Sequence, residues 1–196
     1  VLLKNLRSEA KRFALALNEQ AKVSKFKPKY FEMRFDDKSK IKALKIKAGD
    51  KIISLVGQVD RIDIFDHFFR VIDYKTGVCD TSLKELFFGK KIQLEAYIKT
   101  VKSSLKLKPA GAYYLPIKAG FADEKTTLQA KYSLKGRTLD DIDVILASDR
   151  RFADGQKNSD VVEVRFSQND GEMIHSRYSK VVGQSQLDSL ADYAFE

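Results

Sequence analysis

The chain has 196 residues and a formal net charge of +9, and its 43% hydrophobic and 32% charged residues are typical of a soluble globular protein with a substantial core. No apolar run approaches the roughly 20 residues of a membrane helix, so we expect no membrane association. The single cysteine, Cys79, and the two histidines exclude an internal disulfide framework and a structural zinc or iron–sulfur site within this chain. This cysteine usage fits a reducing compartment, and we expect a cytoplasmic protein.

The positive charge is unevenly distributed along the chain. Residues 52–74 carry 2 basic and 4 acidic side chains, whereas residues 1–51 carry 15 against 6 and residues 75–118 carry 9 against 3. An acidic segment between two basic segments suits a metal site beside a surface that binds phosphates. The alternative is that the lysines are solvated residues on the surfaces of helices and strands.

The first elements are predicted from hydrophobic periodicity. Residues 2–22 have apolar side chains at three- and four-residue steps, which predicts an amphipathic helix. Residues 30–35 alternate as in a strand. Residues 41–47 alternate the apolar residues Ile41, Ala43 (or Leu44) and Ile46 with lysines, which predicts an edge strand facing solvent. After a turn at Gly49 and Asp50, one long strand is expected to lead into a hairpin.

That hairpin, G-Q-V-D-R-I-D-I-F-D-H-F-F-R-V-I-D-Y-K-T-G at residues 57–77, is the most informative stretch of the sequence. We expect two strands joined by a tight turn at Asp66 and His67. In such a hairpin, residues lie opposite each other when their numbers sum to 133. Asp60 then lies opposite Asp73, and side-chain alternation puts both on an otherwise apolar face. Two opposed carboxylates in such a place repel each other unless one takes up a proton or a cation binds between them.

Asp60, Asp73 and Lys75 therefore form a candidate hydrolytic site. The two carboxylates would hold Mg²⁺, with Mn²⁺ as an alternative metal, and the metal would polarise a phosphodiester and lower the pKa of an attacking water. Lys75 points the same way as Asp73 and would orient that water or stabilise charge on phosphate oxygens. Alone, however, an aspartate two residues before a lysine occurs often by chance.

Three nearby residues have competing interpretations. Asp63 falls on the other face of the hairpin opposite Arg70, which favours a cross-strand ion pair over chemistry. Arg61 shares that face and could buttress the pair or contact phosphate. Glu32, on the strand at residues 30–35, could reach the metal site, although a surface ion pair is the simpler interpretation.

The segment after the hairpin is predicted to cross over to a parallel strand. A short apolar piece at residues 83–88 is followed by a predicted helix at about 90–104 and a buried strand at 110–117, which gives a β-α-β unit and a mixed sheet. Gln93 and Tyr97 are four residues apart on that helix and share a face. They could position the lysine or a nucleotide, or Tyr97 could simply pack on the sheet while Gln93 faces solvent.

The remaining elements have weaker signals. We expect a strand near Tyr132, a short helix at residues 139–147, a strand at residues 161–166 and a C-terminal helix at residues 184–194. The predicted fold class is α/β, with a mixed β-sheet flanked by helices and an antiparallel hairpin that carries the acidic residues.

Four segments in this order resemble a known family. G-Q-V-D-R-I-D, V-I-D-Y-K-T-G, G-K-K-I-Q-L-E-A-Y and P-A-G-A-Y-Y-L-P-I are similar to the motifs of PD-(D/E)XK nucleases of the RecB/AddB type, and most of all to the C-terminal nuclease domain of the AddB component of bacterial helicase–nucleases. The resemblance is strongest from residue 57 to residue 117 and covers most of the chain more weakly.

The resemblance implies roles for the matching residues. Asp60 and Asp73 match the metal-binding acids, Lys75 matches the catalytic lysine, and the backbone carbonyl of Tyr74 is a further candidate metal ligand. Gln93 and Tyr97 match the Q-x-x-x-Y motif beside the active site. The implied fold is a restriction-endonuclease-like core, and the implied activity is Mg²⁺-dependent DNA hydrolysis with a helicase subunit of an AddAB-type complex as partner, in double-strand-break processing.

The chain departs from the family pattern in two ways. The family's upstream histidine ligand has no counterpart in residues 1–20, and of four cysteines that often hold an iron–sulfur cluster only Cys79 is present. We therefore expect a fragment of a larger chain that forms one nuclease domain, with a core at about 28–118 and a C-terminal extension at 119–196. The alternatives are a catalytically incomplete nuclease fold that binds DNA or docks a subunit, and a basic protein-interaction domain.

Overall fold

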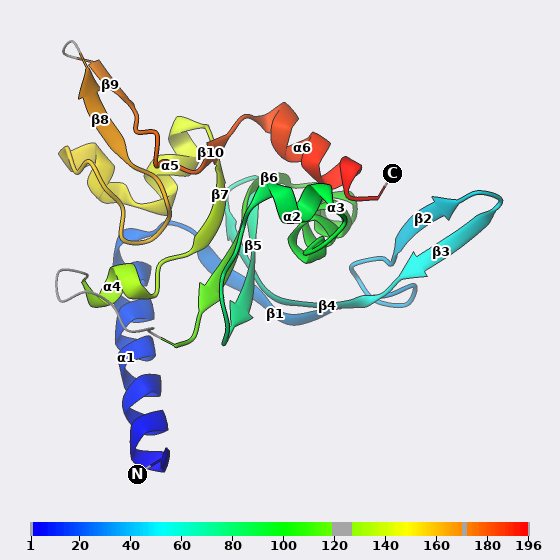
Figure 1. The fold of residues 1–196 in the computed structure, drawn as a ribbon, viewed down its shortest axis with the longest axis horizontal. Coiled ribbons are helices and arrows are strands. Elements are labelled where there is room, and N and C mark those ends of the chain that lie inside the picture. Colours follow the sequence, from blue (N-terminus) through cyan, green and yellow to red (C-terminus); the bar gives the residue numbers. More distant parts are fainter. Residues whose placement is uncertain (1, 119–126, 170–171, 196) are drawn as a thin grey trace.

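The computed structural model describes residues 2–118, 127–169 and 172–195. In chain order its elements are α1 (Leu2–Val23), β1 (Lys27–Phe35), β2 (Leu44–Ala48), β3 (Lys51–Leu55), β4 (Gly57–Phe65), β5 (Phe68–Lys75), α2 (Leu83–Phe87), α3 (Gln93–Leu105), β6 (Lys108–Pro116), α4 (Leu128–Lys131), β7 (Lys135–Leu139), α5 (Ile142–Ser148), the 3-10 helix η1 (Arg150–Asp154), β8 (Phe166–Asn169), β9 (Glu172–His175), β10 (Val181–Val182) and α6 (Gln184–Tyr193). Six strands form one sheet in the order β1-β4-β5-β6-β7-β10 (Figure 1).

The sheet is mixed, as predicted. β4 pairs with β1 and β5 in antiparallel fashion, β5 and β6 are parallel, β6 and β7 are antiparallel, and β7 and β10 are parallel. The parallel pair β5–β6 requires a crossover, which α2 and α3 provide. The α/β fold class and the β-α-β unit are therefore confirmed.

The β4–β5 hairpin has the register expected from its two-residue turn. The pairs run from Phe65↔Phe68 at the turn to Arg61↔Ile72, and Asp63 lies opposite Arg70. The pairing of β4 with β5 ends at Arg61 and Ile72, one residue before the Asp60–Asp73 position, at the end of the hairpin away from the turn. The two acids thus lie just beyond the last paired residues.

Helices cover both faces of the sheet. On one face α3 and α6 bury Tyr97, Ile98 and Leu187 in a cluster with Ile62 and Val71 of the hairpin. On the other face α1 and α5 pack on Ile72, Tyr113 and Leu115 through side chains that include Phe13, Leu17 and Ile145. Figure 1 shows α1 and α5 on one side of the sheet and α3 and α6 on the other. No helix in the described ranges is long and apolar enough to cross a membrane.

The segment before β4 differs from the prediction. Instead of one long strand, the backbone breaks at Val56 between β3 and β4, and β2 and β3 pair with each other as a separate two-stranded sheet. Figure 1 shows this β2–β3 hairpin projecting from the end of β4. Ile41 is not part of a solvent-facing edge strand, because it is fully buried and bridges to Phe35. Ile41 is apolar because it packs in the core at the base of the β2–β3 hairpin.

Two strand predictions in the C-terminal half are wrong. Tyr132 follows the short helix α4, and the strand of this region is β7, which begins three residues further on. The start of α4 is capped by the Thr127 side chain, which accepts a hydrogen bond from the backbone N–H of Ala130. Tyr132 is buried because its ring packs on Phe13 of α1, not because it lies in the sheet. Residues 161–165 form an irregular connection in which Val162 bridges to Leu134 and Arg165 to Asn158, and the next strand begins at Phe166.

The predicted helices are present with later starts. The helix expected from residue 139 begins at Ile142, because Leu139 ends β7 and Asp141 accepts hydrogen bonds from the first free N–H groups of α5. The helix expected from about residue 90 begins at Gln93, because the backbone of Lys91 is in the left-handed region with φ at 55°. The helices at residues 2–22 and 184–194 are confirmed as α1 and α6.

Gly136 of β7 is expected to tolerate no side chain. A Cβ atom there would lie 2.0 Å from the carbonyl oxygen of Ala112 on β6. We expect Gly136→Ala to push β7 away from β6 and to lower the free energy of unfolding by about 3 kcal/mol in urea titrations. Gly77→Ala is the matched control, because nothing lies within 4 Å of its Cβ position. Equal stability of the two variants would contradict the prediction.

Candidate active site

Asp60 and Asp73 lie at the open end of the β4–β5 hairpin, on the face covered by α3. Asp60 Oδ2 accepts a hydrogen bond of 2.9 Å from the backbone N–H of Tyr74, which ties the Asp60 carboxylate to the neighbouring strand. The Asp73 side chain is almost fully buried. The structure thus brings the two acids together as the register predicted.

Lys75 connects the acids to α3. Its ammonium lies 2.6 Å from Asp73 Oδ2 and donates a 2.9 Å hydrogen bond to Gln93 Oε1. Gln93 Nε2 in turn donates to the hydroxyl of Tyr97 at 2.7 Å. The ammonium also lies 5.0 Å from the centre of the Tyr114 ring on β6. Gln93 and Tyr97 therefore share one face of α3 as predicted, and they hold Lys75 over the acids.

Burial and charge shift the ionisation of this group. Burial raises the pKa of Asp73, and the negative charge of Asp60 raises it further, so that the attraction of Lys75 only partly offsets these effects. Burial also raises the pKa of Tyr97 to about 12, with a contribution from the charges of Asp73 and Asp60. Tyr97 therefore remains a neutral hydroxyl at physiological pH, and the charged form of Asp73 is disfavoured by its surroundings.

A buried oxygen of Asp73 has no hydrogen-bond partner. The ion pair of Asp73 Oδ2 with Lys75 lacks hydrogen-bond geometry, and this is one of three such buried side-chain atoms in the part of the chain that the structure describes. Lys75 supplies the counter-charge of this oxygen, but the nearby Asp60 carboxylate adds a second negative charge, so a further cation would be favourable there. Its position beside Asp60 suits a cation between the two acids.

The donor set fits Mg²⁺ better than a metal held in a cage of side chains. Among the described residues no group of three or more His, Cys, Asp or Glu side chains could hold a metal ion. Mg²⁺ is usually bound through one or two carboxylates, with waters and substrate phosphates completing its shell. Asp60 and Asp73, with the Tyr74 backbone carbonyl as a further candidate, match that pattern. The bound metal would polarise the phosphodiester.

Arg61 and Asp63 lie on the opposite face of the hairpin from the acids. Asp63 is fully buried and binds Arg61 through two hydrogen bonds of 2.6 and 2.8 Å, and Arg70 Nη2 lies 2.9 Å from the same carboxylate. The predicted ion pair of Asp63 and Arg70 is therefore confirmed. Arg61, a candidate for contacting DNA, has its guanidinium committed to Asp63 and acts as a buttress in this structure.

Glu32 lies level with Asp60 but turns away from the site. Its neighbours Phe31 and Met33 pair with Arg61 and Val59, which places Glu32 beside Asp60 in the register of β1 and β4. The backbone of Glu32 has φ at 49°, however, and its exposed carboxylate accepts a hydrogen bond from Gln58. The structure therefore does not bring Glu32 into contact with the two acids.

A further buried acid, Glu95, was not predicted. Glu95 is buried on α3 and binds Arg137 of β7 at 3.0 Å, and Arg137 also donates to the backbone carbonyl of Thr81. Burial raises the pKa of Glu95 against the attraction of Arg137. The signal was visible in Q-L-E-A-Y, where an acid stands inside the apolar stripe of a helix, but its partner is 42 positions away.

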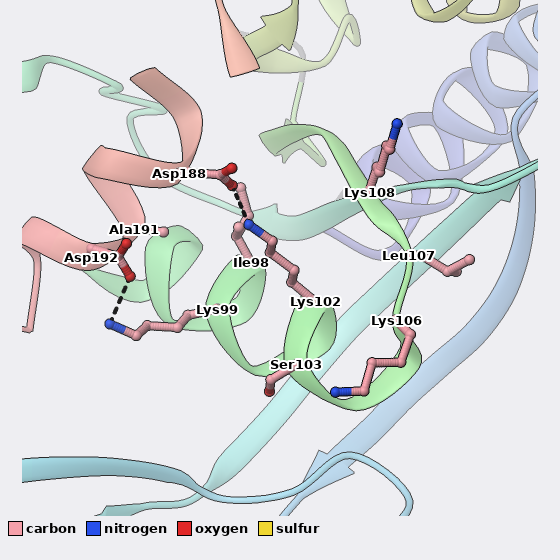
Figure 2. Close-up of a pocket in the computed structure, with 10 residues that line it drawn as sticks. All are labelled: Ile98, Lys99, Lys102, Ser103, Lys106, Leu107, Lys108, Asp188, Ala191 and Asp192. Atoms are coloured by element: carbon pink, nitrogen blue, oxygen red, sulfur yellow. Dashed lines mark hydrogen bonds and ion pairs between the residues drawn. The ribbon is translucent and has the colours of Figure 1, made fainter. Parts of the chain in front are cut away.

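A cavity lies elsewhere in the described part of the chain. It measures about 510 Å³ and is formed by the C-terminal half of α3, the start of β6 and α6. Figure 2 shows Lys102 directed at Asp188 and Lys99 at Asp192, with ion pairs of 2.7 and 3.0 Å. These pairs hold α6 on α3. None of the site residues Asp60, Asp73, Lys75 and Gln93 lines this cavity.

Comparison with known families decides what this arrangement belongs to. The family model described as the PD-(D/E)XK nuclease superfamily matches residues 1–176. The chain belongs to the PD-(D/E)XK nuclease superfamily. The resemblance inferred from the four motifs is thereby confirmed, and the match includes the acids and Lys75 of this superfamily member.

The relatives of this PD-(D/E)XK chain are components of bacterial helicase–nucleases. They are named as the B subunits of ATP-dependent helicase/deoxyribonucleases, and they are 28% identical over 98% of the chain in Exiguobacterium sibiricum, 31% over 93% in Listeria welshimeri and 30% over 76% in Clostridioides difficile. These matches cover 18%, 17% and 14% of the respective relatives. The PD-(D/E)XK chain thus spans less than a fifth of the length of these relatives.

Proposed function

We propose that this chain is a metal-dependent deoxyribonuclease domain, an exonuclease that hydrolyses phosphodiester bonds as part of a larger helicase–nuclease subunit. The observation that carries the proposal is the buried Asp73 carboxylate beside Asp60, paired with the Lys75 ammonium that Gln93 holds. The superfamily and the helicase/deoxyribonuclease relatives support it. The proposed setting is double-strand-break processing in the cytoplasm, with DNA and a helicase subunit of an AddAB-type complex as partners.

The residues of the chain have distinct proposed tasks. Asp60 and Asp73 would hold Mg²⁺ or Mn²⁺, which would supply a lowered pKa for an attacking water and polarisation of the scissile phosphate. Lys75 places its charge where negative charge develops on the phosphate oxygens, and Gln93 keeps that ammonium in position. The basic segments on either side of the hairpin contact the DNA backbone with little sequence readout.

A catalytically incomplete module that only binds DNA or docks a subunit is the second candidate. It is favoured by the absence, among the described residues, of a third side-chain ligand beside Asp60 and Asp73. A third candidate, a basic protein-interaction domain, would be favoured only if no DNA binding survived at low salt.

The proposal is tested by incubating the purified protein with end-labelled DNA in Mg²⁺, in Mn²⁺ and with EDTA. We expect shortening of the labelled strand in either metal and none with EDTA. Binding of Mn²⁺, followed by the loss of its free electron paramagnetic resonance signal, gives a readout that does not depend on activity. DNA binding without cleavage in either metal would favour the incomplete module.

The affinity for Mn²⁺ is expected to depend on pH through Asp73. Protonated Asp73 carries no charge, so affinity falls as the pH decreases through its pKa. Because burial raises that pKa above the ordinary value of 3.8, the loss should begin at a higher pH than an exposed aspartate would produce. Titrations of free Mn²⁺ at a series of pH values measure this. A midpoint at or below the ordinary value would contradict the assignment of Asp73.

A further inference from the structure

Two phenylalanines are exposed side by side in the segment that joins Lys75 to Gln93. Phe87 ends α2 and Phe88 follows it, with 65% and 61% of their surfaces exposed, and their rings meet edge to face with centres 5.4 Å apart. Large aromatic side chains are usually buried, so a pair this exposed calls for a partner. We call Phe87, Phe88 and the neighbouring Tyr193 the aromatic ledge.

The aromatic ledge is connected to the candidate site through a short stretch of chain. α2 lies in the loop between Lys75 and Gln93, and the side chains at both ends of this loop bind each other. Only five residue steps separate Phe88 from Gln93, so their Cα atoms are at most about 18 Å apart. A stacked single strand rises about 3.4 Å per nucleotide, so about five nucleotides would span this distance.

The aromatic ledge is held in place by α6. The ion pairs of Lys99 with Asp192 and of Lys102 with Asp188 fasten α6 to α3 (Figure 2). Tyr193 then lies almost parallel to the Phe87 ring, with 12° between the planes and 6.0 Å between the centres, and its hydroxyl donates to the Phe87 carbonyl at 3.2 Å. Binding on such a surface requires little ordering of these side chains.

The charges around the aromatic ledge favour nucleic acid as its occupant. Lys84 on α2 and Lys90 just beyond it are exposed, and neither has an ion-pair partner among the described residues. Exposed rings beside unpaired cations are the combination with which proteins bind single strands, because rings stack on bases while lysines neutralise phosphates. Leu83 is also exposed, so a hydrophobic protein partner is the competing occupant that a test must separate.

We propose that Phe87 and Phe88 are positioning residues that stack on bases of a single DNA strand whose backbone leads to Asp60, Asp73 and Lys75. This deepens the proposed function and rests on it. The strand would be held by its bases on the aromatic ledge and by its phosphates at Lys84 and Lys90. Recognition would be tolerant of sequence, because every base has a face on which a ring can stack.

The test compares two oligonucleotides of about ten nucleotides, one of thymidines and one with the same phosphates but abasic sugars. Binding is measured with EDTA at low salt, so that no cleavage occurs. We expect the chain to bind the thymidine strand about 5- to 100-fold more tightly than the abasic strand. Phe87→Leu with Phe88→Leu, which keeps apolar surface but removes the rings, should abolish this preference.

Three further variants make the result specific. Phe88→Leu alone removes the ring that does not stack on Tyr193, so it tests the preference even if the double variant folds poorly. Phe88→Trp keeps an aromatic ring and should keep or increase the preference for the thymidine strand. Leu83→Ala, an equally exposed apolar position on α2, should leave the preference unchanged. A wild-type ratio near 1, or a ratio that survives in the double leucine variant, would overturn the proposal and leave a protein partner as the occupant.

A cleavage assay in Mg²⁺ on the same samples separates the two proposals. Cleavage by a wild-type chain that shows no base preference would refute the aromatic ledge and leave the nuclease proposal intact. Base preference without cleavage would refute the nuclease proposal while retaining the stacking surface for a DNA-binding module.

Discussion

Asp73→Asn is expected to abolish DNA cleavage and at the same time to make the metal-free protein more stable at neutral pH. The substitution keeps the size of the side chain but removes the charge that would hold the metal, so we expect cleavage to fall by at least about 100-fold. Lys75→Ala should reduce cleavage to a similar extent without a gain in stability. Rates on end-labelled DNA and urea unfolding of the same samples measure both effects.

The gain in stability follows from the burial of the Asp73 carboxylate. Its pKa is raised in the folded protein, so the folded state binds a proton there more readily than the unfolded chain. Above that raised pKa, the charged carboxylate makes folding less favourable, and Asp73→Asn removes this cost. Below the ordinary aspartate value of 3.8, the carboxyl group is protonated in both states and the gain should vanish.

Asp66→Asn is the matched control for charge. It removes one negative charge from the same hairpin, but at the exposed turn and beside His67. Cleavage and DNA binding should stay close to the wild-type values. If Asp73→Asn cleaved DNA at more than about a tenth of the wild-type rate, the assignment of Asp73 as a metal ligand would be wrong.

Asp63→Ala is expected to have the largest effect on stability. The substitution removes the carboxylate shared by Arg61 and Arg70 and leaves their guanidinium groups without it; the Arg70 side chain is only 3% exposed. Removing one partner of a buried ion pair costs about 3–5 kcal/mol, a large part of the roughly 5–15 kcal/mol by which domains are stable. Urea unfolding at neutral pH would measure this loss.

Two further variants distinguish a buried network from ion pairing in general. Asp37→Ala breaks an exposed 2.7 Å pair with Lys45 and should cost less than about 1 kcal/mol. Replacing Arg61, Asp63 and Arg70 together by Met, Leu and Met should recover much of the loss, because no charge is then left buried. A loss below about 1 kcal/mol for Asp63→Ala would show that the network contributes little.

Part of the site was predictable because a tight turn sets strand register arithmetically. Once the turn was placed at Asp66 and His67, the opposition of Asp63 and Arg70 followed, and Asp60 and Asp73 were placed on one face at the open end. Helical periodicity likewise placed Gln93 and Tyr97 on one face of α3. These relations hold within one hairpin or one helix, so local backbone geometry is enough to derive them.

Other features depend on contacts between distant segments. Tyr132 and the valines before Phe166 have the composition of strands. Tyr132 is buried against Phe13 of α1, and the valines are buried in a cluster with Tyr113 of β6 and Ile145 of α5. Glu95 pairs with Arg137 across the sheet. Local patterns report that a side chain is apolar or acidic, but they do not report which surface covers it.

The sequence by itself determined the superfamily, the α/β class and the antiparallel hairpin, and it nominated Asp60, Asp73 and Lys75 as candidate site residues, because these inferences depend on motif order and on periodicity within single elements. Only the tertiary structure decided that Gln93 holds Lys75, that Arg61 is committed to Asp63, that Glu32 turns away and that Phe87 stacks on Tyr193. Each of these contacts depends on a side-chain rotamer, a local backbone twist or the packing of two helices. None of these is encoded in the spacing of residues along the chain.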